Sequence, residues 1–351
     1  MDDLKAPFPW FGGKSRVAGL VWERFGKVNN YVEPFFGSGA VLLGAPRIHS
    51  TETVNDLDGF VCNFWRAIGK DPEKVASYAD NPVNENDLHA RHIWLVNHRD
   101  ELVPRLEGDP DYYDAKIAGW WVWGICCWIG GEFCSGKGPW QIIDGQLVHL
   151  GSSGQGVSRR RVHLGNAGKG VNRKRVHLGN AGKGVNRKLV HLGNAGLGVN
   201  RKLVHLGDAG LGLHDWFKKL ACRLRNVRVC CGDWSRICGP MPTVKIGTTA
   251  MFLDPPYGKD ADRYDNLYVN DSLSVAGDVA RWAIEHGDDP LMRIALCGYE
   301  GEHNMPDSWE CIAWKANGGY ASQGSKENVN ATRERVWFSP HCERSGQMSM
   351  F

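Results

Sequence analysis

The chain has 351 residues, 42% of them hydrophobic and 23% charged, and this length allows one large or two small domains with a sizeable core. The formal net charge is only +3, and the longest apolar stretch, residues 117–129, is far shorter than the ~20 residues that a membrane-spanning helix needs. The eleven cysteines form no C-x-x-C pair and no signal pattern begins the chain, so we expect reduced thiols, no metal site and a soluble cytoplasmic protein.

The N-terminal third predicts the start of an α/β fold. Residues 15–25 have a helical pattern, and residues 31–39, with the sequence YVEPFFGSG, predict a strand followed by a glycine turn into a helix over 40–44. Residues 51–56 predict a second strand ending in Asp56, about twenty residues beyond the first glycine, where nucleotide-binding folds present a carboxylate to ribose hydroxyls. Position 42 is Leu, so the full G-x-G-x-x-G pattern is absent, which favours a nucleoside over a dinucleotide.

The middle of the chain predicts helices followed by a repeat. Residues 58–68 and most of 71–129 have helical patterns, and then Val-His-Leu-Gly recurs at positions 148, 162, 176, 190 and 204, a strict 14-residue period. Each copy reads as a short strand, a turn and a short strand, so stacked copies predict a β-rich arm with outward-facing histidines, and partial disorder is the alternative. Residues 146–213 hold 12 Lys and Arg against one acid, Asp208, which indicates a polyanionic partner.

The C-terminal part returns to the α/β pattern, with a helix over 214–224 and strands around 227–231, 249–253, 293–297, 309–314 and 335–338. We therefore predict a Rossmann-like, seven-stranded α/β core built from residues 1–70 and 226–351. Residues 71–225 form an inserted, mostly helical region that carries the repeats at about 146–213.

The sequence Asp254-Pro255-Pro256-Tyr257 directly follows the apolar strand 249–253. Neither proline can donate a ladder hydrogen bond, so the strand stops and leaves a carboxylate at its carboxyl end, where open α/β sheets bind ligands. An exocyclic amine on a nucleobase is a poor nucleophile, and the carboxylate of Asp254 and the carbonyl of Pro255 could each accept one of its hydrogens. Tyr257 would offer a flat face for a base that has left the duplex.

Four segments, PWFGGK at 9–14, EPFFGSG at 33–39, ND at 55–56 and DPPY at 254–257, resemble in kind and order the motifs of Dam-type (D12 class) DNA adenine-N6 methyltransferases of phage or bacteria. The resemblance covers roughly residues 6–70 and 226–300. It implies an S-adenosylmethionine-dependent methyltransferase core with an inserted target-recognition domain, acting on double-stranded DNA by base flipping. A companion restriction endonuclease, and a bacterial or phage-infected host cell, would fit but are not decided by the sequence.

The resemblance also implies roles for single residues. The catalytic residues would be Asp254, Pro255, Pro256 and Tyr257. Residues expected to contact S-adenosylmethionine are Trp10, Lys14, Glu33, Pro34, Phe35, Gly37, Gly39, Asp56, Asp233, Trp234 and Asp254. For three of these a structural alternative stays open: Trp10 as a core aromatic, Lys14 as a solvated lysine at a helix start, and Asp233 as a helix N-cap.

DNA contacts are expected from the inserted region. An aromatic side chain at Trp128, where a helix runs into a glycine loop, could fill the space left by an extruded base, and packing beneath the recognition domain is the equal alternative. Phosphate contacts are expected from the basic residues of the repeats, namely Arg159, Arg160, Arg161, Arg173, Lys174, Arg187, Lys188, Arg201 and Lys202. Other functions left open are N4-cytosine DNA methylation, RNA adenine methylation and non-catalytic DNA binding.

Overall fold

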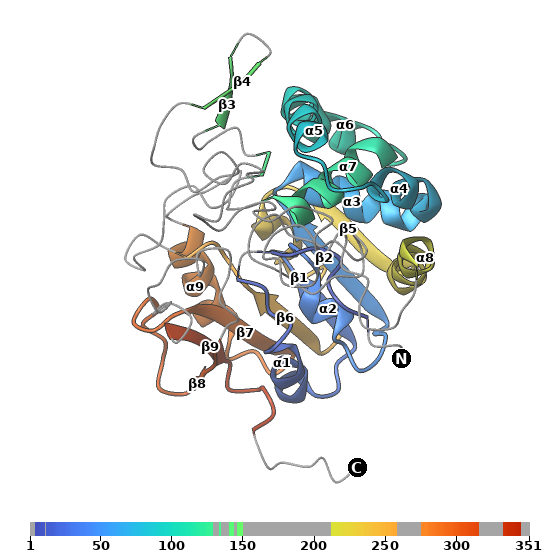
Figure 1. Ribbon diagram of the computed structural model, residues 1–351. Coiled ribbons are helices and arrows are strands. Elements are labelled where there is room, and N and C mark those ends of the chain that lie inside the picture. The colour runs from blue at the N-terminus through green and yellow to red at the C-terminus, as the bar shows by residue number, and fades with distance from the viewer. Residues whose placement is uncertain are drawn as a thin grey trace, which may run out of the picture.

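A computed structural model describes residues 4–10, 12–128, 133–134, 140–143, 146–149, 212–257, 275–315 and 333–344. Its centre is a seven-stranded sheet with the order β5-β2-β1-β6-β7-β9-β8 (Figure 1). The strands are β1 (Asn30–Glu33), β2 (Thr51–Asp56), β5 (Val227–Cys231), β6 (Thr249–Leu253), β7 (Met292–Tyr299), β8 (Glu310–Ala313) and β9 (Glu334–Phe338). Only β9 runs antiparallel to its neighbours, so the predicted seven-stranded α/β sheet is confirmed.

The central pair of strands explains why the site lies where it does. β1 pairs with β2 on one side and with β6 on the other, in parallel, with Val32 opposite both Thr53 and Met251. The strand order therefore reverses between β1 and β6, and ligands bind at the carboxyl ends beside such a reversal. All five residues of β6 are buried, as a strand covered on both faces requires.

The helices begin at recognisable caps. The side chains of Asp58, Asp71 and Asp114 accept hydrogen bonds from the first turns of α3, α4 and α7, which satisfies amides that have no partner inside the helix. The helices are α1 (Ala18–Phe25), α2 (Ala40–Leu43), α3 (Gly59–Lys70), α4 (Pro72–Ala79), α5 (Glu85–Asn97), α6 (Arg99–Gly108), α7 (Ala115–Cys127), α8 (Leu213–Leu224), α9 (Val275–His286) and the 3₁₀ helix η2 (Trp234–Ile237). The first helix starts at Ala18 rather than at Ser15.

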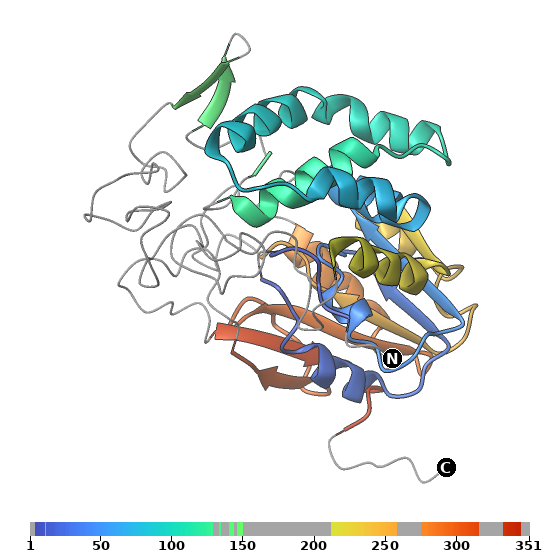
Figure 2. The same cartoon turned by 45° about the vertical axis from the view of Figure 1, so that its right-hand side comes forward.

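The sheet is covered on both faces. On one face, Tyr31 and Phe252 belong to a core shared with α1, α2, α3, α4, α7 and α8, and on the other Val32 and Met251 pack with α9 and η2. Figure 2 shows α5 and α6 as an outer layer, with α7 and α4 between them and the rest of the molecule. The helices of the inserted region thus share one hydrophobic core with the sheet, and the domain boundaries at 70/71 and 225/226 stay a prediction.

The part of the inserted region after α7 is described only in short pieces. An antiparallel hairpin joins β3 (Trp140–Ile143) to β4 (Gln146–His149), so Val148 and His149 of the first repeat copy lie in a strand as predicted. The remaining copies, with all nine basic residues expected to contact DNA, lie outside the described residues. Trp128 is only 4% exposed and packs edge-on to His92 with ring centroids 4.7 Å apart, which is the packing alternative rather than an exposed aromatic.

All eleven cysteines are free thiols, and Cys126 and Cys127 are core residues. In the described ranges, no helix has the length and apolar character needed to cross a membrane. The same residues contain no group of three or more His, Cys, Asp or Glu arranged to hold a metal ion.

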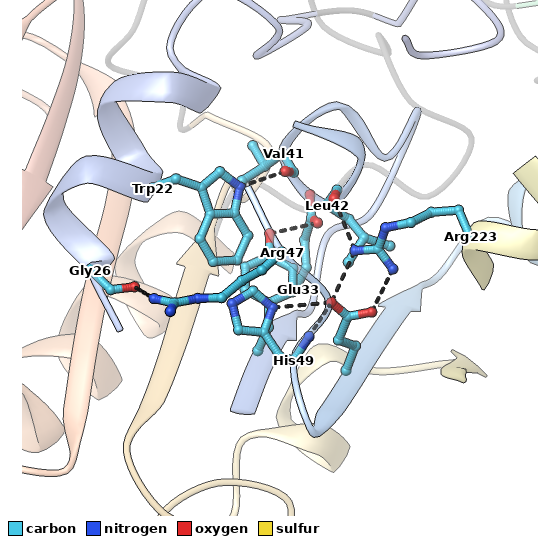
Figure 3. A network of polar contacts seen from close by, with 10 residues as sticks. Trp22, Gly26, Glu33, Val41, Leu42, Arg47, His49 and Arg223 are labelled. Atoms are coloured by element: carbon cyan, nitrogen blue, oxygen red, sulfur yellow. Dashed lines mark hydrogen bonds and ion pairs between the residues drawn. The ribbon is translucent and has the colours of Figure 1, made fainter. Parts of the chain in front are cut away.

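A buried ion pair fastens α8, where the chain returns from the insertion, to β2. Arg223 donates to both carboxylate oxygens of Glu52, at 2.6 and 2.9 Å, and to the carbonyl of Leu42 at 3.1 Å. His49 lies on the other side of this carboxylate, 3.1 Å from it, and its ring stacks on Trp22 (Figure 3). Burial would raise the pKa of Glu52, but the hydrogen bonds from His49 and Arg223 outweigh it and hold the pKa below 4.5.

We expect the substitution Arg223→Ala to lower the free energy of unfolding by about 3–5 kcal/mol, because it leaves the buried carboxylate of Glu52 without its cation. Arg105→Ala, which removes an exposed ion pair within α6, is the matched control and should change it little. Folding lowers the pKa of Glu52, so its ionised carboxylate stabilises the fold above pH 4.5 and loses this effect as the pH falls. The unfolding free energies of the wild type and Arg223→Ala should therefore become similar in acid. Urea denaturation checks this, and an equal loss in both variants would contradict it.

Candidate active site

Asp254 follows the last residue of β6 and forms an ion pair with Lys14. The Nζ of Lys14 lies 2.8 Å from Oδ2 of Asp254, and it also donates to the carbonyl of Gly12 at 2.7 Å. The Asp254 side chain is 19% exposed, so it is partly buried but still in contact with solvent. The contact brings the predicted N-terminal and DPPY motifs together.

Lys14 is a buried residue rather than the solvated lysine of the alternative interpretation. Its Nζ lies 5.5 Å from the ring centroid of Tyr257 and 5.7 Å from that of Trp314, so two aromatic rings surround the ammonium group. Burial alone would lower the pKa of Lys14, but the carboxylates of Asp254 and Glu334 outweigh it and raise the pKa. Lys14 is therefore a fixed positive charge at the centre of the site.

Tyr257 differs from the expected open stacking surface. Its side chain is 8% exposed, and its hydroxyl donates a 2.7 Å hydrogen bond to Oε2 of Glu334, at the start of β9. The ring of Tyr299 packs against it at 4.5 Å, with an interplanar angle of 64°. No sequence motif marks Glu334, because a single acid near the C-terminus comes near the site only when β9 pairs beside β7.

The glycine turn after β1 is held by Asp56 at the end of β2. The amide of Gly37 donates to Oδ2 of Asp56 at 2.8 Å, and the amide of Asp58 donates to Oδ1 at 2.9 Å. Both turn glycines have positive φ, +46° at Gly37 and +68° at Gly39, which glycine adopts without strain. The turn and the acid, separated in sequence, thus meet as predicted.

Trp10 lies against this turn, where a Cβ on Gly37 would be 2.4 Å from its indole nitrogen. Trp10 is also near the ring of Trp121, with centroids 6.4 Å apart, so it is both a partly buried core aromatic and a neighbour of the turn. The opposite side of the turn is closed by Trp65, whose indole N–H donates to the carbonyl of Gly37 at 2.9 Å.

The ends of β1, β2 and β5 are tied together by Asn55, whose amide donates to the carbonyls of Pro34 and Gly232 at 3.1 and 2.9 Å. This linkage aligns the segments that carry Phe35 and Trp234, whose rings are nearly parallel, 28° between planes, with centroids 6.3 Å apart. Asp233 is exposed and caps η2, accepting from the amide of Ser235 at 3.0 Å, which matches its structural alternative.

The site is rich in buried carboxylates. Glu33 is 2% exposed and accepts a 2.7 Å hydrogen bond from the hydroxyl of Tyr31, so it lies beneath the surface rather than on it. Burial raises the pKa of Glu33, Asp56, Asp254 and Glu334, and the carboxylates of Asp56 and Asp254 raise that of Glu33 further. Several acids near the ammonium of Lys14 make a site that favours a cationic ligand.

We expect Gly37→Ala to lower the free energy of unfolding by at least about 1 kcal/mol, because a Cβ is disfavoured at positive φ and would collide with Trp10. The control is Gly69→Ala near the end of α3, where a Cβ meets nothing within 4 Å and the protein should gain about 0.5–1 kcal/mol. Denaturation in urea compares the two, and an unchanged or more stable Gly37→Ala protein would contradict the geometry.

A protein-family model matches the part of the chain that supplies the N-terminal half of this site. Residues 10–111 match the model of the family described as D12 class N6 adenine-specific DNA methyltransferase. No curated protein matches the chain. The matched range contains Trp10, Lys14, the glycine turn and Asp56, and the ion pair of Lys14 extends the site to Asp254 outside that range. The match supports an enzyme whose activity is the methylation of N6 of adenine in DNA.

Proposed function

We propose that this protein transfers a methyl group from S-adenosylmethionine to N6 of adenine in double-stranded DNA, after the adenine has turned out of the duplex. The observation that carries the proposal is the 2.8 Å contact of Lys14 with Asp254, beside the turn that Asp56 supports. It joins the matched segment to the DPPY motif at one edge of the sheet. Asp254, the carboxylate that would polarise the target amine, then lies at the same edge as the glycine turn that would bind the nucleoside.

The residues present fit S-adenosylmethionine, which is a nucleoside with a positively charged sulfur and an ammonium group. Asp56 accepts hydrogen bonds from the amides of Gly37 and Asp58, which fix its carboxylate at the carboxyl end of β2, where it would meet the ribose hydroxyls. Gly37 has no Cβ, and this lets the indole of Trp10 lie directly against the turn. The rings of Phe35 and Trp234 offer apolar surface for the adenine of the cofactor.

When bound, S-adenosylmethionine supplies an electrophilic methyl group. The chain's own contribution is to orient the target amine: Asp254 and the carbonyl of Pro255 each accept one amine hydrogen, which directs the nitrogen lone pair outward. Burial raises the pKa of Asp254, and the ammonium of Lys14 opposes this effect and fixes the position of the carboxylate. Asp254 acts as an acceptor, since the amine proton can leave after the methyl group has been transferred.

The remaining predicted residues have supporting roles in this proposal. Pro256 stiffens the segment after Asp254, and Tyr257 lines the base site through the small part of its ring that is exposed. The basic repeats would contact phosphates and offset the few kcal/mol that base flipping costs. Trp128 would contribute to the base site only if its packing against His92 changed.

We expect Asp254→Ala to reduce methyl transfer to DNA by about 10²–10³-fold or more, because the amine loses a preorganised acceptor. The measurement is incorporation of labelled methyl into duplex DNA, with mass analysis of the nucleosides to separate N6-methyladenine from N4-methylcytosine. Asp278→Asn on α9, where an exposed carboxylate pairs with Arg281, is the control and should retain activity. Undiminished transfer by a folded Asp254→Ala protein would refute the assignment. Faster methylation of structured RNA than of DNA would refute the substrate.

The affinity for S-adenosylmethionine should rise with pH. Burial raises the pKa of Asp56, Asp254 and Glu334 above their ordinary values, and that of Asp58 to about 7, so these acids lose protons and attract a cation as the pH rises toward 7. The stability of the ligand-free protein should change in the opposite direction and fall as the pH rises. An acid whose pKa is raised by folding stabilises the fold at low pH and loses that contribution as the pH rises.

Calorimetric titrations across this pH range check the prediction. S-adenosylhomocysteine, which lacks the charge on sulfur, is the matched ligand, and its affinity should depend less on pH. Equal pH dependence for the two ligands would show that the carboxylates do not act on the sulfonium charge.

A further inference from the structure

Glu334 is a buried carboxylate that contacts the site from β9, two strands away from β6 in the sheet. It is 3% exposed, it is the first residue of β9, and it pairs with Tyr299 of β7. Its backbone carbonyl accepts from the amide of Trp314, one of the two rings around Lys14, at 3.2 Å. Strand pairing therefore fixes the backbone position of Glu334. From there its side-chain Oε2 accepts a 2.7 Å hydrogen bond from the Tyr257 hydroxyl.

This hydrogen bond is the polar anchor of the Tyr257 ring. The ring also packs against Tyr299, at 4.5 Å, and its centroid lies 5.5 Å from the ammonium of Lys14. These two contacts do not fix the direction of the hydroxyl, which hydrogen-bonds to Glu334 and also interacts with the carboxylate of Asp254. Tyr257 is joined to Asp254 through the two prolines, so a change in its ring angle would move the carboxylate and the Pro255 carbonyl together.

The hydrogen bond to Tyr257 does not explain why residue 334 is an acid. A neutral amide could accept the same hydrogen bond without the cost of burying an ion. The carboxylates of Glu334 and Asp254 both act on Lys14. With Glu334 sharing the ammonium charge, Lys14 does not have to be neutralised by Asp254 alone. More of the electron density of Asp254 then stays available to the target amine.

We propose that Glu334 is a positioning residue for methyl transfer, which fixes the ring of Tyr257 through its hydroxyl and shares the charge of Lys14 with Asp254. The proposal rests on the proposed function, since it assigns Glu334 to the same reaction. Glu334 touches no reacting atom and acts only through Tyr257 and Lys14. It should therefore affect the rate of transfer more than the binding of the methyl donor.

A mutant cycle on the full chain separates the two actions. Tyr257→Phe removes the hydrogen bond, Glu334→Gln keeps an acceptor but removes the charge, and Glu334→Ala removes both. We expect kcat to fall about tenfold or more for each variant, with KM for S-adenosylmethionine changed less than about threefold. In the Tyr257→Phe background, Glu334→Gln should still lower kcat, whereas Glu334→Ala should lower it no further than Glu334→Gln does.

Glu300→Gln is the control, because Glu300 pairs with Arg335 on β9 but is exposed, and its kcat should not change. Melting temperatures and circular dichroism establish that each variant is folded, and Glu334→Gln with Tyr257→Phe keeps the test valid if Glu334→Ala does not fold. The inference would be overturned if folded Glu334→Gln and folded Tyr257→Phe both kept the wild-type kcat. It would also be overturned if the loss of kcat in each variant only matched its unfolded fraction. A wild-type protein without methyl transfer would instead overturn the proposed function.

Discussion

The ion pair between Lys14 and Asp254 is the interaction on which the site depends. A buried ammonium group is costly unless a carboxylate compensates for it, and here the compensating carboxylate follows β6, near the opposite end of the chain. The pairing therefore requires the N-terminal segment to lie across the carboxyl ends of β1 and β6. Trp10 then lies against the glycine turn, and the residues of the N-terminal, glycine-turn and DPPY motifs share one edge of the sheet.

Parallel strand pairing brings the other residues of the site to the same edge of the sheet. The ends of β1, β2, β5 and β6 carry Glu33, Asp56, Cys231 and Asp254 at neighbouring positions because the strands run in the same direction and in register. Carboxylates that are far apart in sequence then concentrate in a partly buried region, where burial, and after it the carboxylates of Asp254 and Asp56, raise the pKa of Glu33. The negative charge that gathers there favours a cationic ligand.

The helical insertion is attached to the sheet by packing and by one buried ion pair. The aromatic rings of Phe8, Phe64 and Trp121 form continuous contacts between the N-terminal segment, α3 and α7. Arg223 and Glu52 fix the helix that returns from the insertion to β2.

The sequence by itself determined the strands, the glycine turn, Asp56 and the DPPY segment, because strand propensity, positive φ at Gly37 and proline termination act within a few residues. Tertiary structure decided what depends on distant pairing. It buried Lys14 against Asp254, turned the hydroxyl of Tyr257 toward Glu334, and packed Trp128 into the interior. No local pattern reports these contacts, because burial and the partner of a side chain are fixed only when strands and helices from separate parts of the chain come together.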